Sequence, residues 1–172
     1  MCLKKMCIAA VTVMLAMSFA DTTMASGHNE DFLIDESGTL TGYSGDGGDI
    51  VIPDGVMCIG DFAFKNCDSI TGVYIPDGVV SIGEGAFAEC DEIETVRVPE
   101  SVESMGKAAF LRCVKLKEIT IPDGVSHISN YAFDSCVSLE KVNISESSSL
   151  KHIGYSSFAE CKSLGEFFIP NG

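Results

Sequence analysis

The length of 172 residues predicts one domain together with processing segments. The formal net charge is −14, from 25 acidic and 11 basic residues, which argues against nucleic acids and anionic lipid surfaces as partners because both are negatively charged. Apolar residues make up 46% of the chain, a content typical of a packed domain and not of a disordered one.

Residues 1–25 are predicted to be a secretory signal peptide. Lys4 and Lys5 form a short basic start, an uncharged and largely apolar run follows at residues 6–20, and small residues precede a cleavage point after Ala25. The run is short for a membrane span, and an uncleaved N-terminal anchor is the alternative. Cleavage predicts a protein that is secreted or held at the cell surface, with no membrane span once the signal is removed.

Residues 26–49 are predicted to be an N-terminal capping segment. Apolar residues at 32–34 and at Leu40 and Tyr43 flank a turn, a pattern that predicts two short strands in a hairpin. Terminal repeats need a distinct cap, so we expect this hairpin to cover the apolar end of the first coil. The stretch rich in Asp and Gly at 44–49 is expected to be a flexible turn. It occurs once, whereas calcium-binding loops of this composition are iterated.

From residue 50 onward the sequence repeats with a period of 23 residues. Near copies of one unit occupy residues 52–74, 75–97, 98–120 and 121–143, and a fifth copy at 144–168 is stretched to 25 residues. A fixed period of this size is typical of a solenoid, in which each coil packs only on its neighbours. Residues 50–172 are therefore predicted to form about five coils.

Each position of the unit has a packing role. Alternation at Val96 and Val98 predicts a short strand with these side chains inward, and Pro99 ends it because proline lacks the N–H that a ladder needs. Val79 and Ile82 form an inward-facing return side. One phenylalanine per copy predicts a stacked aromatic column, with a short helical turn around it. The column comprises Phe64, Phe87, Phe110, Phe133 and Phe158.

Five of the eight cysteines share one repeat position: Cys67, Cys90, Cys113, Cys136 and Cys161. One cysteine per coil in an apolar context predicts a column of buried thiols. Disulfides between neighbouring coils, which export permits, are one alternative, and a metal site is another, although zinc favours clustered ligand pairs. Cys58 breaks the pattern. It is expected near the surface and is the candidate for a reactive or pairing thiol.

The sequence predicts no enzyme, cofactor or metal site. His28, His127 and His152 lack ligand spacing, although the last two share a repeat position. Neither a nucleophile motif, a phosphate loop nor a paired-carboxylate signature stands out. A small hydrolase or thiol enzyme is the alternative, and it would depend on Cys58 or a histidine.

The unit, IPDGVxxIGxxAFxxCxxLxxVxI, resembles the 23-residue leucine-rich repeats of BspA-like bacterial surface and secreted proteins. The resemblance covers roughly residues 50–172, and residues 31–51 resemble the entry segment of that class. It implies a leucine-rich-repeat solenoid of α/β class: a strand-rich, right-handed superhelix with a parallel concave sheet and short convex turns. It also implies an exported, non-catalytic interaction module. Members of the class include surface adhesins, which would bind protein or glycan ligands through the concave sheet.

The outward positions of the concave sheet are the predicted binding face. Acidic and basic residues alternate across neighbouring strands in two triplets, Glu94–Lys117–Glu140 and Glu118–Lys141–Glu166, so the sheet can satisfy its own charges. Tyr, Arg and Phe are residue types that dominate interface energies, and Tyr74, Arg97 and Phe168 are the foremost candidates. The predicted contact residues are Tyr74, Glu94, Arg97, Lys117, Thr120, Lys141, Asn143 and Phe168.

The last residues, 169–172, open another copy of the repeat. Without a cap, Phe167 and Ile169 are expected to leave a sheet edge and apolar core open to solvent, which favours pairing with another chain. The sequence therefore predicts an uncapped C-terminus that can self-associate. The alternative function is a structural spacer, or a truncated fragment of a longer repeat protein.

Overall fold

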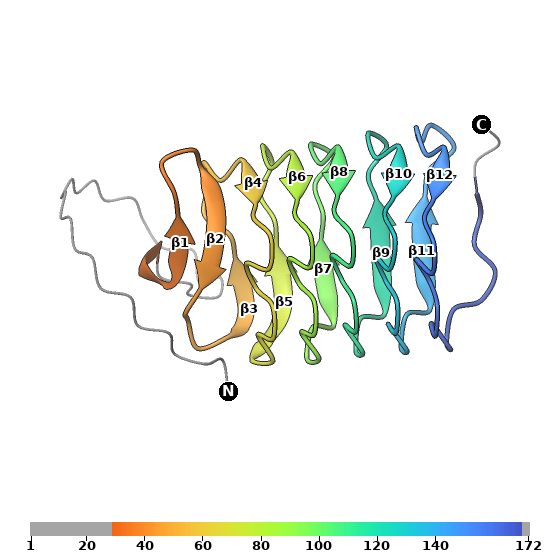
Figure 1. Cartoon of the computed structure of the whole chain (residues 1–172), viewed down its shortest axis with the longest axis horizontal. Helices are drawn as coiled ribbons and strands as arrows, with labels where there is room; N and C mark the ends of the chain where they lie inside the picture. Colours follow the sequence, from red (N-terminus) through yellow and green to blue (C-terminus); the bar gives the residue numbers. More distant parts are fainter. Residues whose placement is uncertain (1–28, 170–172) are drawn as a thin grey trace.

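The structure is a computed structural model that describes residues 29–169. The predicted signal peptide and residues 170–172 lie outside the described part. Figure 1 shows short strands stacked side by side along one long axis, with a hairpin at the N-terminal end. The predicted strand-rich solenoid with a parallel sheet is confirmed. Among the described residues, the one helical element is the 3-10 turn η1 (Asn29–Asp31).

One face of the solenoid is a five-stranded parallel sheet in the order β11-β9-β7-β5-β3. Its strands are β3 (Gly48–Val51), β5 (Ile70–Tyr74), β7 (Thr95–Arg97), β9 (Glu118–Ile121) and β11 (Lys141–Ile144). Because the repeat length is constant here, residues 23 apart face each other: Gly72 lies opposite Thr95, and Thr95 opposite Glu118. The first strand departs from this rule, since a register shift places Gly48 opposite Ile70 where the period predicts Thr71.

The return side of each coil forms a second sheet, which the sequence did not predict. Its strand order is β1-β2-β4-β6-β8-β10-β12, and all pairs after the hairpin are parallel. The two-residue strands are β4 (Cys58–Ile59), β6 (Ser81–Ile82), β8 (Ser104–Met105), β10 (His127–Ile128) and β12 (His152–Ile153). Two residues are too few for a strand to show the alternation by which strands are recognised in sequence.

The N-terminal hairpin has the predicted form. Strands β1 (Phe32–Ile34) and β2 (Thr39–Tyr43) pair antiparallel, and β2 then pairs in parallel with β4. The ring of Tyr43 packs between Phe32, at a centroid distance of 5.1 Å, and Phe64, at 5.6 Å. The hairpin thus starts the second sheet and covers the apolar end of the first coil.

The centre of the solenoid is the predicted aromatic column. Successive rings from Phe64 to Phe133 lie 4.9, 5.2 and 5.5 Å apart, and Phe133 lies 5.3 Å from Phe158. All four ring pairs are stacked, with planes within 8° of parallel. Phe167 tilts onto the last ring at 5.2 Å. Each boundary between coils is therefore spanned by one apolar contact between aromatic rings, and these contacts form a continuous column along the array.

The predicted helical turn around each phenylalanine is wrong. Two residues per coil, four positions apart, adopt left-handed φ angles between 52° and 62°. They are Phe62, Gly85, Ala108, Tyr131 and Ser156 at the first position, and Asn66, Glu89, Arg112, Ser135 and Glu160 at the second. A left-handed residue cannot continue a right-handed helix. In this segment every second backbone N–H instead donates a hydrogen bond to a carbonyl oxygen of the next coil. The Phe64 N–H, for example, donates to the Ala86 carbonyl at 2.8 Å.

Backbone pairing thins at one boundary, between the coil of β7 and β8 and the coil of β9 and β10. The β7–β9 ladder registers one residue pair, against three for β5–β7 and four for β9–β11. In the second sheet, β8–β10 likewise registers one pair, Met105 opposite Ile128. The Phe110–Phe133 distance of 5.5 Å spans the same boundary and is the longest of the four stacked pairs. We call this boundary the seam.

Candidate binding face

The first row of outward side chains on the five-stranded sheet follows the predicted register. It consists of Val51, Tyr74, Arg97, Thr120 and Asn143. Residues 165–169 form no strand, so the sheet itself ends at β11 and does not extend to Phe168. Phe168 is exposed and lies beside Asn143, where the two side chains line a common hollow.

Acidic side chains of the sheet are engaged by neighbouring coils. Glu118 accepts a hydrogen bond from Asn143 Nδ2 at 2.5 Å and pairs with Lys141 Nζ at 3.2 Å, and these two contacts lower the pKa of its carboxyl. Glu94 pairs with Lys117 at 2.9 Å, and this hydrogen bond lowers the pKa of Glu94. Each predicted triplet therefore contributes one ion pair.

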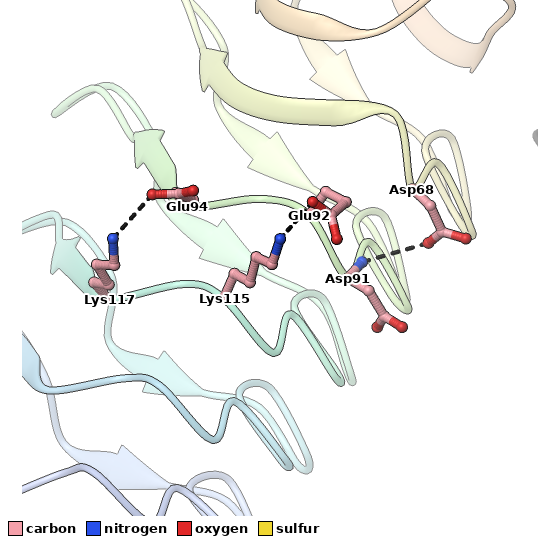
Figure 2. A network of polar contacts seen from close by, with 6 residues as sticks. All are labelled: Asp68, Asp91, Glu92, Glu94, Lys115 and Lys117. Carbon is pink, nitrogen blue, oxygen red and sulfur yellow. Dashed lines mark hydrogen bonds and ion pairs between the residues drawn. The ribbon is translucent and has the colours of Figure 1, made fainter.

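Ion pairs between residues 23 apart also extend beyond the strands. Figure 2 shows Glu92 with Lys115, at 2.5 Å, beside the Glu94–Lys117 pair. In the same view the Asp91 backbone N–H donates to an Asp68 carboxylate oxygen at 3.4 Å. Exposed pairs of this kind add little stability. Their effect is to occupy Glu92 and Glu94 with lysines of the next coil.

Arg97 is an exception to this pattern. Its guanidinium carbon lies 4.6 Å from the ring centroid of Tyr74, a cation–π arrangement between in-register residues of β7 and β5. Both side chains are exposed. Within residues 29–169, no carboxylate forms an ion pair with Arg97. The cation is held in place by the aromatic face, and its N–H donors remain available.

Arg97 separates two hollows in the sheet surface. The larger, about 560 Å³, lies along the seam between β7 and β9 and includes Lys117 and Thr120 in its lining. The smaller, about 400 Å³, lies over β3, β5 and β7. Thr95 lines both hollows together with Arg97. Thr95 is not among the contact residues predicted from the sequence, although its outward repeat position leaves it free to contact a partner.

The cysteine column is a ladder of hydrogen-bonded thiols. Each Sγ from Cys90 onward donates to the carbonyl oxygen of a phenylalanine in the preceding coil, at 2.9 to 3.1 Å. Burial raises the pKa of Cys113 and Cys136, and raises that of Cys161 to about 11. No two cysteines within residues 29–169 are joined by a disulfide. These thiols are structural, because a raised pKa suppresses the nucleophilic thiolate.

The remaining candidates lie on the second sheet. Cys58 is half-buried on β4, opposite Ser81. His127 and His152 face each other across β10 and β12 with ring centroids 5.8 Å apart, and the His127 Nδ1 contacts Ser126 Oγ at 2.8 Å. In the part of the chain that the structure describes, no group of three or more His, Cys, Asp or Glu side chains is arranged to hold a metal ion.

Comparison with known families finds a match over most of the chain. The model of the BspA type leucine rich repeat region matches residues 45–172 in six copies. A search of curated proteins finds no match to the sequence.

Three solved structures share the architecture. A leucine-rich repeat protein from Bacteroides ovatus ATCC 8483 is 26% identical, with a TM-score of 0.59 over 72% of this chain and 37% of that one. A leucine rich cell surface protein from Faecalibacterium prausnitzii A2-165 is 25% identical, with a TM-score of 0.59 over 84% of this chain and 54% of that one. The T. pallidum leucine rich repeat protein, at 19% identity and a TM-score of 0.54, covers 81% of this chain and 91% of its own, and shows the fold alone.

The chain therefore spans about a third to a half of the first two relatives. Between residues 29 and 169, the structure has no helix with the length and hydropathy that a membrane crossing requires.

Proposed function

Because this chain belongs to the BspA-type leucine-rich repeat family, we propose that it is an exported, non-catalytic interaction module that binds a protein or glycan ligand. The ligand binds the outward face of the five-stranded sheet. The observation that carries the proposal is the exposed Tyr74–Arg97 pair, fixed at 4.6 Å in the middle of this sheet. Resemblance to a cell surface protein of the same fold supports export.

The face suits binding because its backbone is rigid and its side chains vary from coil to coil. Inward positions repeat as apolar residues that pack one coil on the next, for example Val73 and Ile119, which are almost fully buried. Outward positions of the same strands carry Tyr74, Arg97 and Thr120 in one row. A rigid scaffold that presents variable side chains binds partners at low entropic cost.

Engagement of the reactive groups supports a non-catalytic role. The thiols of Cys113 and Cys136 donate to main-chain carbonyls, and Glu94 and Glu118 are paired with lysines. A catalytic site needs a nucleophile or base whose reactive atom faces the substrate. These groups instead face their neighbours in the array.

Binding assays on matched variants test the proposal. The chain is applied to a glycan array and to immobilised extracellular-matrix proteins, and the best ligand is measured by surface plasmon resonance. Tyr74→Ala, Arg97→Ala and Asn143→Ala are expected to weaken binding about tenfold or more, as central interface residues do. Lys107→Ala and Arg112→Ala, which lie outside the five-stranded sheet, serve as controls. Equal binding by all five variants would contradict the assignment to this face.

Self-association is the second candidate, favoured by two exposed apolar residues beyond β11. Phe168 and Ile169 are 54% and 51% exposed. A structural spacer whose partner is a second copy would show a concentration-dependent dimer in sedimentation equilibrium, and Phe168→Ser with Ile169→Ser would abolish it. A monomer across the concentration series would argue against this candidate and leave the first one intact.

A further inference from the structure

We infer that the ligand of the five-stranded sheet is a peptide segment of a protein, and that Arg97 binds one of its carboxylates. The inference rests on the proposed function and specifies its ligand. It is carried by the unpaired charge of Arg97, by the local charge of the sheet, by the hollows on either side and by the covered face of Tyr74.

Arg97 lacks the partner that its lysine neighbours have. Lys117 and Lys141 each pair with a glutamate of the preceding coil, at 2.9 and 3.2 Å. Arg97 contacts the Tyr74 ring instead, and none of the ion pairs among residues 29–169 includes it. A guanidinium that stacks on an aromatic face keeps its fork of N–H donors in the plane of the group, which matches the two oxygens of a carboxylate.

The sheet does not repel an acidic group, although the whole chain carries a net charge of −14. The five strands contain two acidic residues, Asp49 and Glu118, and two basic residues, Arg97 and Lys141, so their formal net charge is zero. The carboxylates are occupied as well: Asp49 accepts a hydrogen bond from Thr71 at 2.7 Å, and Glu118 is paired with Lys141. The remaining acidic excess of the chain lies outside the five strands.

The surface around Arg97 has room for side chains of a bound segment. The hollow of about 560 Å³ along the seam and the hollow of about 400 Å³ beside it meet at Arg97. Thr120, which follows Arg97 in the row, accepts a hydrogen bond from Asn143 Nδ2 at 3.3 Å, so its own O–H is available to donate. A carboxylate on Arg97 can therefore receive a second contact from the same row.

The aromatic residue favours a peptide over a sugar. A sugar ring that stacks on an aromatic side chain needs an open face of that side chain. Tyr74 has Val51 on β3 and Arg97 on β7 as its register neighbours, and the Arg97 guanidinium covers one face of its ring. An extended peptide needs no such face, since its backbone spans about 3.3 Å per residue and its side chains can enter successive hollows.

The test uses a phage-displayed random dodecapeptide library panned on the full chain. Enriched peptides that the Tyr74→Ala variant fails to bind are synthesised. In each peptide, every Asp and Glu is changed in turn to its amide, and the C-terminus is amidated. Binding is measured to the wild type, to Arg97→Gln, to Arg97→Lys and to the control Arg112→Gln, an exposed arginine outside the five-stranded sheet.

One carboxylate is expected to matter: its removal should weaken binding to the wild type about 10- to 100-fold, the size of a charge-assisted hydrogen-bond pair. The same removal should have no further effect on Arg97→Gln. Arg97→Lys should recover part of the affinity, because it keeps the charge without the fork, and Arg112→Gln should bind as the wild type does.

The outcomes separate the two proposals. Sheet-binding peptides that tolerate loss of every carboxylate, or that lose affinity equally in Arg97→Gln and wild type, overturn the inference and leave the proposed function standing. The same holds if an oligouronide binds through Arg97 while no peptide binds the face. If no peptide, glycan or matrix protein depends on Tyr74 or Arg97, both proposals fail.

Discussion

The rings of Phe87 and Phe110 lie 5.2 Å apart with planes 7° from parallel, and both are fully buried. Each ring therefore has a phenylalanine on both of its faces, one from the coil before and one from the coil after. Removing one ring leaves a cavity that its two neighbours share, because adjacent coils are held at their spacing by the two sheets.

Phe110→Ala is expected to lower the free energy of unfolding by about 3–5 kcal/mol, the range for a buried Phe truncation. Urea denaturation followed by circular dichroism measures the change. Phe62→Ala is the matched control, since Phe62 is 51% exposed at the corner of its coil and should change stability by less than about 0.5 kcal/mol. Similar losses for both variants would contradict a central column.

The thiol column should resist alkylation in the folded chain. Cys58, half-buried on β4, is expected to react first with a maleimide at pH 8. Cys161 should react slowly, since a pKa of about 11 leaves roughly a thousandth of its thiol ionised at that pH. Cys113 should react only after unfolding, because it is fully buried. Peptide mapping by mass spectrometry gives the order, and rapid native labelling of Cys113 would refute the packing described.

Stability should fall at acidic pH through the paired carboxylates. The pKa of Glu118 is lowered in the fold by Asn143 and Lys141. A lowered folded-state pKa means that the contribution is present above the ordinary value of 4.5 and is lost as pH falls through the lowered value. In thermal melts from pH 7 to pH 3, the melting temperature of Glu118→Gln should fall less steeply with acidification than that of the wild type. Glu103→Gln, an exposed control outside the ion pairs of the described residues, should keep the wild-type slope.

Two adjacent glycines at the start of β3, Gly47 just before the strand and Gly48 as its first residue, should respond differently to alanine. Both take positive φ angles, 96° at Gly47 and 76° at Gly48. A Cβ at Gly48 meets open space, so Gly48→Ala should cost only about 1–2 kcal/mol of backbone strain. A Cβ at Gly47 would overlap the Ser69 carbonyl oxygen, so Gly47→Ala should cost about 3 kcal/mol or more. Urea unfolding of the two variants measures the difference. Equal unfolding midpoints for Gly47→Ala and Gly48→Ala would contradict the predicted steric overlap at Gly47.

The period of 23 predicted the five-stranded sheet to the level of register, because a constant repeat length places equivalent residues opposite each other. That reasoning placed Tyr74 beside Arg97 and Glu118 beside Lys141 correctly. It could not give the cation–π contact, which depends on side-chain rotamers. It also could not show that residues 165–169 form no strand beside β11, because a repeat position predicts a strand only where a ladder forms.

Two other features had no sequence signal. The strands of the second sheet are too short for alternation to be visible. The left-handed corner positions carry residues as different as Phe62, Gly85 and Tyr131, so no glycine or asparagine signature marks them. The stacking of coils, rather than local propensity, sets these φ angles, and a helical turn was therefore the wrong expectation there.

We expect the seam to divide the array into two folding units. In a solenoid, stability is the sum of terms within coils and terms between neighbouring coils, so the boundary with the fewest backbone pairs opens first. Both sheets register a single pair there, Thr95–Glu118 and Met105–Ile128. Unfolding from the C-terminal end would then pause at the seam, with the coils up to β8 still folded. In this state the Phe110 ring would be exposed. A protease that samples this state would cut the chain just beyond that ring, before β9.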